Sequence, residues 1–105
     1  MYPFEIFVVF LSWEMGGKSR PVLVLMTGGN SIDVLPITTQ FAGKSDAIRA
    51  KYFKLNDWRQ EGLNKQSYVD TGTLIALPIA ALKNKTPIGK LTDNDKKRLL
   101  KFLSK

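Results

Sequence analysis

Residues 20–26, Arg20-Pro21-Val22-Leu23-Val24-Leu25-Met26, are rich in apolar β-formers and predict a buried strand. Pro21 has no N–H to donate to a β-ladder, so we place it at the start of this strand. Gly28-Gly29-Asn30 comes next and predicts a hairpin turn, because glycine and asparagine adopt positive φ angles. Residues 31–38 then form the second strand. If these two strands pair as a hairpin, we expect their outer ends to bring Arg20 and Thr38 close together.

Further strands are expected on both sides of this hairpin. Residues 4–11 are dense in β-formers and predict a strand that is buried on both faces. Residues 48–55 alternate at first between an apolar face, which includes Tyr52, and a basic face, and they predict a half-exposed strand. Residues 66–77 contain two strand-like segments on either side of Gly72.

The clearest helix is expected at the C-terminal end of the sequence. Thr92 suits the N-cap, and Asp95 follows it at the spacing of a capping box, with aspartate in place of the usual glutamate. Leu99, Phe102 and Leu103 have the spacing of an apolar helix face. This helix therefore packs on the predicted strands.

Two shorter segments are expected between the strands and this helix. Residues 56–62 predict a short helical turn that Gly62 ends. Residues 78–87 predict another helical turn or irregular chain. Together these elements indicate a mainly β domain with some α structure, spanning residues 1–105. Its expected architecture is a small, partly open β-barrel with short helical insertions and a C-terminal helix.

Composition excludes several kinds of site. The 105 residues include neither cysteine nor histidine, so disulfides, thiol nucleophiles, Cys/His zinc sites and Ser-His-Asp triads are ruled out. Sixteen basic and nine acidic residues give a net charge of +7, which indicates a polyanionic partner or simply serves solubility. The apolar run at residues 4–13 is shorter than the roughly 20 residues that span a bilayer. We expect a cytoplasmic location and no membrane partner.

Known nucleotide and metal motifs do not fit. Residues 15–19 and residues 43–45 each contain Gly-Lys-Ser, which also ends a P-loop. The first glycine of a P-loop is missing in both cases, because Ser12 and Thr38 occupy the two positions where it is needed. Asp93-Asn94-Asp95 begins like a calcium loop, but basic residues follow where ligands belong. The carboxylates are scattered along the chain, and we expect no metal cluster.

One pair of polar residues suits a phosphodiester. Arg20 lies where a loop enters the buried strand, and Thr38 and Thr39 follow the next strand. A guanidinium beside hydroxyl groups, in a basic protein, can bind phosphate oxygens.

Several short motifs occur in an order and spacing found in one protein family. They lie at residues 17–25, 36–40, 57–59, 67–70 and 88–91 and cover nearly the whole chain from Gly17 onward. In these motifs the chain resembles the MazF/PemK toxins of bacterial type II toxin–antitoxin systems.

The resemblance implies an SH3-like barrel, a homodimer and cleavage of single-stranded RNA, such as mRNA, without a metal or cofactor. It also implies a cognate acidic antitoxin that covers the basic groove. By position it implies Arg20 and Thr38 as the main catalytic pair, with Asp70 as an acidic residue near the scissile phosphate. The residues expected to bind RNA are Lys18, Ser19, Thr39, Gln40, Lys44, Arg49 and Lys51.

The implied reaction uses the 2′-OH of RNA as nucleophile and leaves a 2′,3′-cyclic phosphate and a 5′-OH. Arg20 stays protonated, so it can stabilise negative charge but cannot serve as the base. We expect Asp70 to act as the base. Each residue also has a structural interpretation, since Arg20 can pair with Glu14, and Thr38 and Asp70 can be ordinary turn residues.

Other functions stay open at this point. A non-enzymatic barrel of the same type can bind nucleic acid or inhibit a protein target such as gyrase, and an inert relative is a further alternative. Trp13, Phe41 and Trp58 can stack on bases or lie in the core. For Trp58 we favour the core.

Overall fold

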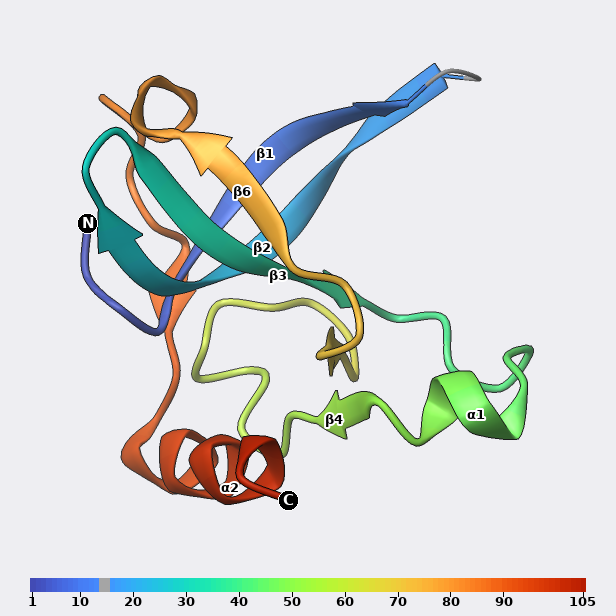
Figure 1. Ribbon diagram of the computed structural model, residues 1–105. Helices are drawn as coiled ribbons and strands as arrows, with labels where there is room; N and C mark the ends of the chain where they lie inside the picture. The colour runs from blue at the N-terminus through green and yellow to red at the C-terminus, as the bar shows by residue number, and fades with distance from the viewer. Residues whose placement is uncertain (14–15) are drawn as a thin grey trace.

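The computed structural model describes residues 1–13 and 16–105 (Figure 1). The strands and helices follow one another as β1 (Glu5–Trp13), β2 (Gly16–Gly28), β3 (Ser31–Thr38), α1 (Asp46–Arg49), β4 (Tyr52–Lys54), β5 (Tyr68–Asp70), β6 (Ile75–Pro78), the 3-10 turn η1 (Ile79–Ala81), β7 (Gly89–Lys90) and α2 (Asp93–Leu103).

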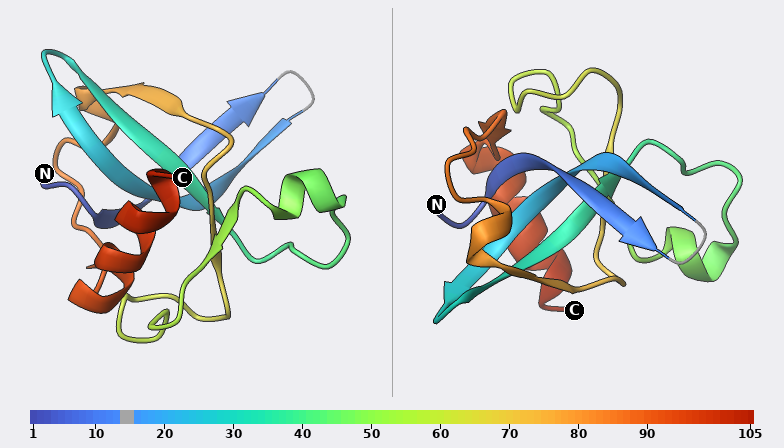
Figure 2. Two further views of the ribbon diagram at one scale, coloured as in Figure 1. Left: turned by 60° about the horizontal axis from the view of Figure 1, so that its bottom comes forward. Right: turned by 90° about the horizontal axis from the view of Figure 1, so that it is seen from above.

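The seven strands within the described part of the chain form one antiparallel sheet with the order β4-β5-β3-β2-β1-β7, and β6 pairs with β3 beside this path. β3 pairs with β6 through residues 31–34 and with β5 through Ile37 and Thr38. Its two halves therefore have different neighbouring strands, and β5 and β6 diverge from each other. The sheet therefore curls without closing, and α2 packs beside it (Figures 1 and 2). The predicted mainly β, partly open barrel with a C-terminal helix is confirmed.

Two apolar cores lie on the two faces of the sheet. Leu23 belongs to the core that also contains Leu99 of α2, whereas Val22 and Val24 belong to the core that contains Leu82 after η1. This separation follows from the strand geometry, because successive side chains point to opposite faces. Both cores are continuous across β1, β2 and β3, and these strands form a rigid support for the groups at their ends.

The central hairpin matches its prediction except for the place of Pro21. β2 ends at Gly28 and β3 begins at Ser31, with Gly29 at a φ of 58° in the two-residue turn. β2 begins at Gly16, however, so Pro21 lies inside it, opposite Val8 of β1. The pairing with β3 begins only at Val22. Proline is tolerated because β2 has a partner on one side only at this point.

β1 is less buried than its sequence predicts. Ile6 and Phe7 are both buried, but Val8 and Phe10 have exposed fractions of 39% and 65%. The prediction of a strand buried on both faces is therefore wrong for the second half of β1. The physical reason is that this half pairs with residues 16–21 of β2, where the hairpin extends beyond β3.

The segment 48–55 is not one strand, contrary to the prediction from its alternating pattern. Ser45 caps α1 by accepting a hydrogen bond from the Ile48 N–H, and the strand β4 begins only at Tyr52. A local N-cap satisfies backbone donors that a short exposed strand would leave to solvent. Capping therefore outweighs the alternation of side chains here.

Residues 56–62 form the expected turn, which ends at Gly62. The Glu61 N–H donates to the Asp57 carbonyl at 3.1 Å, and Gly62 has a φ of 91°. A Cβ on Gly62 would lie 2.2 Å from the Ile88 carbonyl oxygen, and one on Gly89 would lie 2.1 Å from the Glu61 carbonyl oxygen. Two backbone segments therefore cross here at a distance that only glycine permits.

This crossing gives a prediction about stability. We expect Gly62→Ala to lower the free energy of unfolding by about 3 kcal/mol, because it combines a left-handed backbone with a clash against rigid backbone. Urea unfolding followed by circular dichroism measures this loss. Gly28→Ala is the matched control, since a Cβ there has no neighbour within 4 Å among the described residues. Equal stability of the two variants would contradict the prediction.

α2 begins as predicted at the N-cap Thr92, whose hydroxyl accepts from the Asp95 N–H at 3.2 Å. The reciprocal bond of a capping box is absent from the described residues, because the Thr92 N–H donates to Glu61 instead. Leu99 is buried and Phe102 packs against Phe53 with ring centroids 5.4 Å apart.

The predicted apolar face of α2 is wrong in one position. Leu103 has an exposed fraction of 42%, whereas Asp95 and Leu99 are fully buried. Leu103 lies about 100° around the helix axis from Phe102, away from the line through Asp95, Leu99 and Phe102. The buried stripe of α2 is therefore partly acidic.

Candidate active site

A cavity of about 550 Å³ lies where the ends of several strands meet. The structure brings three predicted catalytic residues to it, namely Arg20 from β2, Thr38 from the end of β3 and Asp70 from the end of β5. The other lining residues are Phe10, Leu11, Ser12, Pro36, Gln40, Lys44, Tyr52, Ile75 and Leu77. Apolar walls thus surround a small group of charged and hydroxyl side chains.

Arg20 supplies a positive charge to the cavity from a rigid position. It lies on β2 opposite Val9, next to the buried residues that begin at Val22. Among residues 1–13 and 16–105, its guanidinium has no carboxylate partner within ion-pair distance. The alternative pairing with Glu14 lies outside the described residues. The donors of Arg20 are therefore available to an anion as far as the structure describes.

Thr38 combines a turn role with a place in the cavity. Its Oγ1 accepts a hydrogen bond from the Gln40 N–H at 3.0 Å, and its side chain is nearly buried. This bond holds the chain where it leaves β3, as the turn interpretation predicts. Because the hydroxyl accepts in this bond, its proton stays available to a ligand in the cavity.

Asp70 is also held by a turn. Its Oδ1 accepts from the Gly72 N–H at 2.9 Å and its Oδ2 from the Thr73 hydroxyl at 2.8 Å. The turn interpretation is therefore confirmed, and the same carboxylate lines the cavity. Each carboxylate oxygen has further lone pairs, so both bonds orient the group without exhausting its capacity to accept.

Tyr52 is a residue of this cavity that the sequence did not single out. It stands directly opposite Asp70 in the pairing of β4 with β5, and its ring lies 6.3 Å from that of Phe41. Burial raises the pKa of the Tyr52 phenol, the Asp70 charge raises it further, and the Arg20 charge lowers it. The place of Tyr52 in the cavity depends on the register of β4 on β5, and no pattern in the sequence indicates this register.

The residues expected to bind RNA lie in different surroundings. Gln40 and Lys44 line the cavity. Lys18 and Ser19 stand on β2 opposite Leu11 and Phe10 and are exposed, outside the set that lines the cavity. Thr39 lies in a second pocket, together with Val8 and Ile88.

The other two residues expected to bind RNA, Arg49 and Lys51, are not among those that line the cavity. The Arg49 side chain forms an ion pair with Asp46 and lies over the Phe41 ring, 5.7 Å from its centroid. Lys51 is exposed, and its side chain packs near Gly72 in the turn that follows Asp70. The charge of Arg49 is thus partly neutralised by Asp46. The Lys51 side chain lies close to the turn that follows Asp70.

The aromatic residues considered for base stacking have protein partners where they are described. Phe41 stacks on Tyr68 with centroids 4.4 Å apart and planes at 14°. Trp58 packs against the apolar core, with Arg59 over its ring at 4.9 Å, which confirms the core interpretation. The Trp13 side chain lies outside the described residues.

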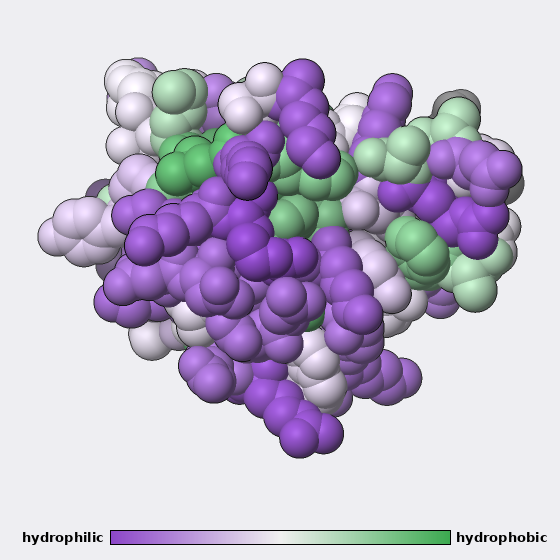
Figure 3. All heavy atoms as spheres, turned by 90° about the horizontal axis from the view of Figure 1, so that it is seen from below, coloured by the Kyte–Doolittle hydropathy of each residue, from purple (hydrophilic) through white to green (hydrophobic). Residues whose placement is uncertain are grey.

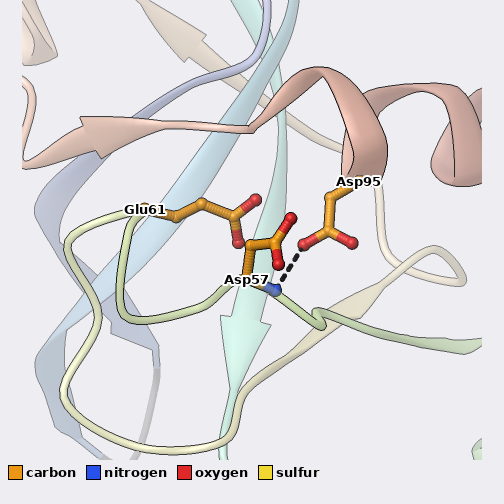
Figure 4. Close-up of side chains that lie close together, drawn as sticks. All are labelled: Asp57, Glu61 and Asp95. Carbon is orange, nitrogen blue, oxygen red and sulfur yellow. Dashed lines mark hydrogen bonds between the residues drawn. The ribbon is translucent and has the colours of Figure 1, made fainter.

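Three carboxylates gather away from the cavity, contrary to the expectation that they stay scattered. Asp57, Glu61 and Asp95 place one oxygen each within 4.8 Å of the others (Figure 4). Asp95 accepts from the Asn56 and Asp57 N–H groups at 3.3 and 2.9 Å and pairs with Arg98 at 2.5 Å. These three carboxylates could hold a cation, but most of their oxygens already bind donors of the protein.

Glu61 is the unusual member of this carboxylate cluster. It is fully buried, and its Oε1 has no hydrogen-bond partner among the described residues. The pKa of Glu61 is raised from 4.5 to about 8, mainly because the group is buried; the Thr92 N–H lowers this pKa, and Asp95 and Asp57 raise it further. Glu61 is therefore protonated at neutral pH, and its proton offsets one of three neighbouring negative charges.

The surface of the molecule, seen from the side of α2, is mainly hydrophilic, with separate hydrophobic areas (Figure 3). No helix within residues 1–13 and 16–105 has the length and apolar character needed to cross a membrane.

The architecture defines a small, half-open β-barrel with a C-terminal helix and an arginine-containing cavity at its strand ends. Solved toxin structures share this fold. The Mycobacterium tuberculosis toxin MazF-mt6 superimposes with a TM-score of 0.66 at 22% identity, covering 93% of this chain and 92% of that one. A second M. tuberculosis toxin gives a TM-score of 0.64 at 22% identity, covering 92% and 96%. No family model and no curated protein matches the sequence.

The chain therefore has the fold of MazF toxins, and the resemblance drawn from its motifs is confirmed at the level of the fold.

Proposed function

We propose that the protein is the toxin of a type II toxin–antitoxin system and cleaves single-stranded RNA, such as mRNA, as a metal-independent endoribonuclease. The observation that supports this most is the meeting of Arg20 and Thr38 in one cavity on a MazF-type fold. An arginine that has no carboxylate partner among residues 1–13 and 16–105, placed on a strand and lining one cavity with a hydroxyl group, suits a phosphate that gains negative charge during reaction.

The proposed reaction is an attack of the RNA on its own backbone. The 2′-oxygen bonds to the adjacent phosphorus, and the bond from phosphorus to the 5′-oxygen breaks. Asp70 accepts the proton of the 2′-OH, and Arg20 binds the phosphate oxygens. The Thr38 hydroxyl donates a hydrogen bond to the same phosphate. The products are a 2′,3′-cyclic phosphate and a 5′-OH end.

The proposed partners follow from charge and surface. A net charge of +7 suits both RNA and an acidic antitoxin that covers the cavity. We also propose that the protein forms a homodimer in the cytoplasm, and the exposed Val8 and Phe10 on β1 offer an apolar area for such contact.

One observation favours a second function. Both Asp70 oxygens accept hydrogen bonds within a turn, which would equally suit a purely structural aspartate. In that case the barrel would bind nucleic acid or inhibit a protein target such as gyrase without catalysis. An inert relative would do neither.

The test of the proposed function uses the purified protein on a long single-stranded RNA with EDTA present. We expect cuts at discrete positions, with fragments that end in a 2′,3′-cyclic phosphate and begin with a 5′-OH. Mapping both ends of each fragment identifies the chemistry and the preferred sequence. A folded protein that cuts none of a broad set of RNAs would overturn the proposal and favour the binding function.

Asp70→Asn separates the catalytic role of Asp70 from its turn role. The asparagine oxygen can still accept from the Gly72 N–H, so the turn persists, but an amide cannot take up the 2′-OH proton. We expect the cleavage rate to fall about 100-fold. Thermal unfolding should be nearly unchanged. Full cleavage activity in a folded Asp70→Asn protein would show that Asp70 is structural only.

A further inference from the structure

We propose that Tyr52 is a catalytic residue of this RNA cleavage and that its hydroxyl donates a proton to the departing 5′-oxygen. The inference rests on the function proposed above and assigns the step that Arg20, Thr38 and Asp70 leave open. A departing alkoxide is strongly basic, so its release is easier when a nearby group protonates it.

The strand register places Tyr52 where this step would occur. Tyr52 and Asp70 are directly opposite each other on β4 and β5. Side chains at opposed positions of antiparallel strands lie on the same face, with Cβ atoms about 5 Å apart. Both residues line the cavity that also contains Arg20 and Thr38. The phenol and the carboxylate are therefore neighbours on one wall.

The length of the tyrosine side chain matters for an in-line reaction. The attacking 2′-oxygen and the departing 5′-oxygen lie on opposite sides of the phosphorus, so base and acid must flank the phosphate. The Tyr52 hydroxyl extends several ångströms further from its backbone than the Asp70 carboxylate. Because the two side chains differ in length, Asp70 can reach the attacking 2′-oxygen while Tyr52 reaches the departing 5′-oxygen of the same phosphate.

The surroundings of Tyr52 keep its proton in place before reaction. Burial and the Asp70 charge both raise the pKa of the phenol, and Arg20 lowers it by less than they raise it. The phenol is consequently protonated at neutral pH. The phenol is still far more acidic than the alcohol that forms when the 5′-oxygen leaves. Transfer of the Tyr52 proton to the 5′-oxygen is therefore energetically favourable.

The other groups of the cavity suit this step less well. Arg20 does not release a proton in the accessible pH range, and the hydroxyls of Ser12 and Thr38 are too weakly acidic. Lys44 is exposed on the loop after β3, and its flexible four-carbon side chain fixes the position of its ammonium group poorly. Among the described residues that line the cavity, Tyr52 is the group that combines a transferable proton with partial burial.

The complete step conserves atoms and charge. The 2′-oxygen forms its bond to phosphorus while its proton moves to Asp70. The bond from phosphorus to the 5′-oxygen breaks, and the electron pair stays on that oxygen, which takes the proton of Tyr52. The Tyr52 phenolate and the Asp70 carboxyl group then exchange protons with water and return to their starting forms.

The experiment compares Tyr52→Phe with the wild type in single-turnover cleavage of a short RNA that contains one mapped cleavage site. We expect the rate to fall about 100-fold. The dissociation constant for a 2′-deoxy analogue of the same RNA should be unchanged. Tyr68→Phe is the matched control, since Tyr68 stacks on Phe41 outside the cavity and its loss should leave the rate unchanged. Circular dichroism and thermal unfolding check that both variants are folded.

A modified substrate distinguishes proton donation from a structural role. When sulfur replaces the departing 5′-oxygen, the thiolate leaves without a proton, so Tyr52→Phe should cleave this RNA at the wild-type rate. An equal loss on both substrates would overturn the inference, as would wild-type cleavage of the ordinary RNA by Tyr52→Phe. A wild-type protein that cleaves neither RNA would instead overturn the proposed function, together with the role of Tyr52.

Discussion

Arg20→Ala is expected to reduce RNA cleavage by about 10²–10³-fold, the loss typical when a preorganised donor to a developing anion is removed. Arg20 lies on β2, two positions before the buried Val22, and its side chain lines the cavity, so its backbone needs little reorganisation during reaction. Alanine removes both its charge and its paired N–H donors. Initial rates on a fluorescent RNA with one mapped site measure the effect.

Two further variants sharpen this prediction. Arg20→Lys keeps the charge but loses the planar pair of donors, and we expect an intermediate rate. Arg59→Ala is the matched control, because Arg59 lies over the Trp58 ring away from the cavity and its loss should leave cleavage unchanged. A folded Arg20→Ala protein with wild-type activity would contradict the role of Arg20 while leaving the assignment of the fold intact.

Features set by neighbouring residues could be predicted from the sequence. The turn at Gly28-Gly29-Asn30 specifies the hairpin of β2 and β3, and the cap at Thr92 specifies the start of α2. The hairpin alone also brings Arg20 and Thr38 to one end of the sheet. These parts depend on local backbone chemistry, which the sequence displays directly.

Features set by distant contacts could not be predicted. The exposure of Phe10 depends on how far the β1–β2 hairpin extends past β3. The N-cap at Ser45 is a different case, because it is local and the alternation at residues 48–55 concealed it. Tyr52 enters the site only through the register of β4 on β5. Such pairings join segments that are far apart in the chain, and no local pattern encodes their alignment.

The cluster of Asp57, Glu61 and Asp95 is the strongest example, because α2 meets the turn at residues 56–62 across more than thirty positions of sequence. It makes stability depend on pH. The folded state raises the pKa of Glu61 from 4.5 to about 8, so it binds the proton more tightly than the unfolded chain does. The resulting stabilisation is complete below about pH 4.5 and is lost as the pH rises through about 8.

Glu61→Gln should remove this dependence, since the amide stays neutral at every pH and its oxygen can still accept from the Thr92 N–H. We expect the variant to be more stable than the wild type at pH 9 by on the order of 3 kcal/mol. At pH 5 the two proteins should be nearly equal. Urea unfolding at pH 5, 7 and 9 measures the difference.

The same titration distinguishes a proton from a metal ion at this cluster. A bound cation would screen the carboxylates, so calcium or magnesium chloride would stabilise the wild type at pH 9 and EDTA would reverse that gain. We expect neither addition to change the wild-type free energy of unfolding, because the oxygens of Asp95 already bind backbone N–H groups and Arg98. Parallel pH profiles of wild type and Glu61→Gln would refute the protonated state of Glu61. A decline in stability between about pH 4.5 and 8 that only the wild type shows would identify the Glu61 proton as its source. That proton would then stabilise the junction of α2 with residues 56–62.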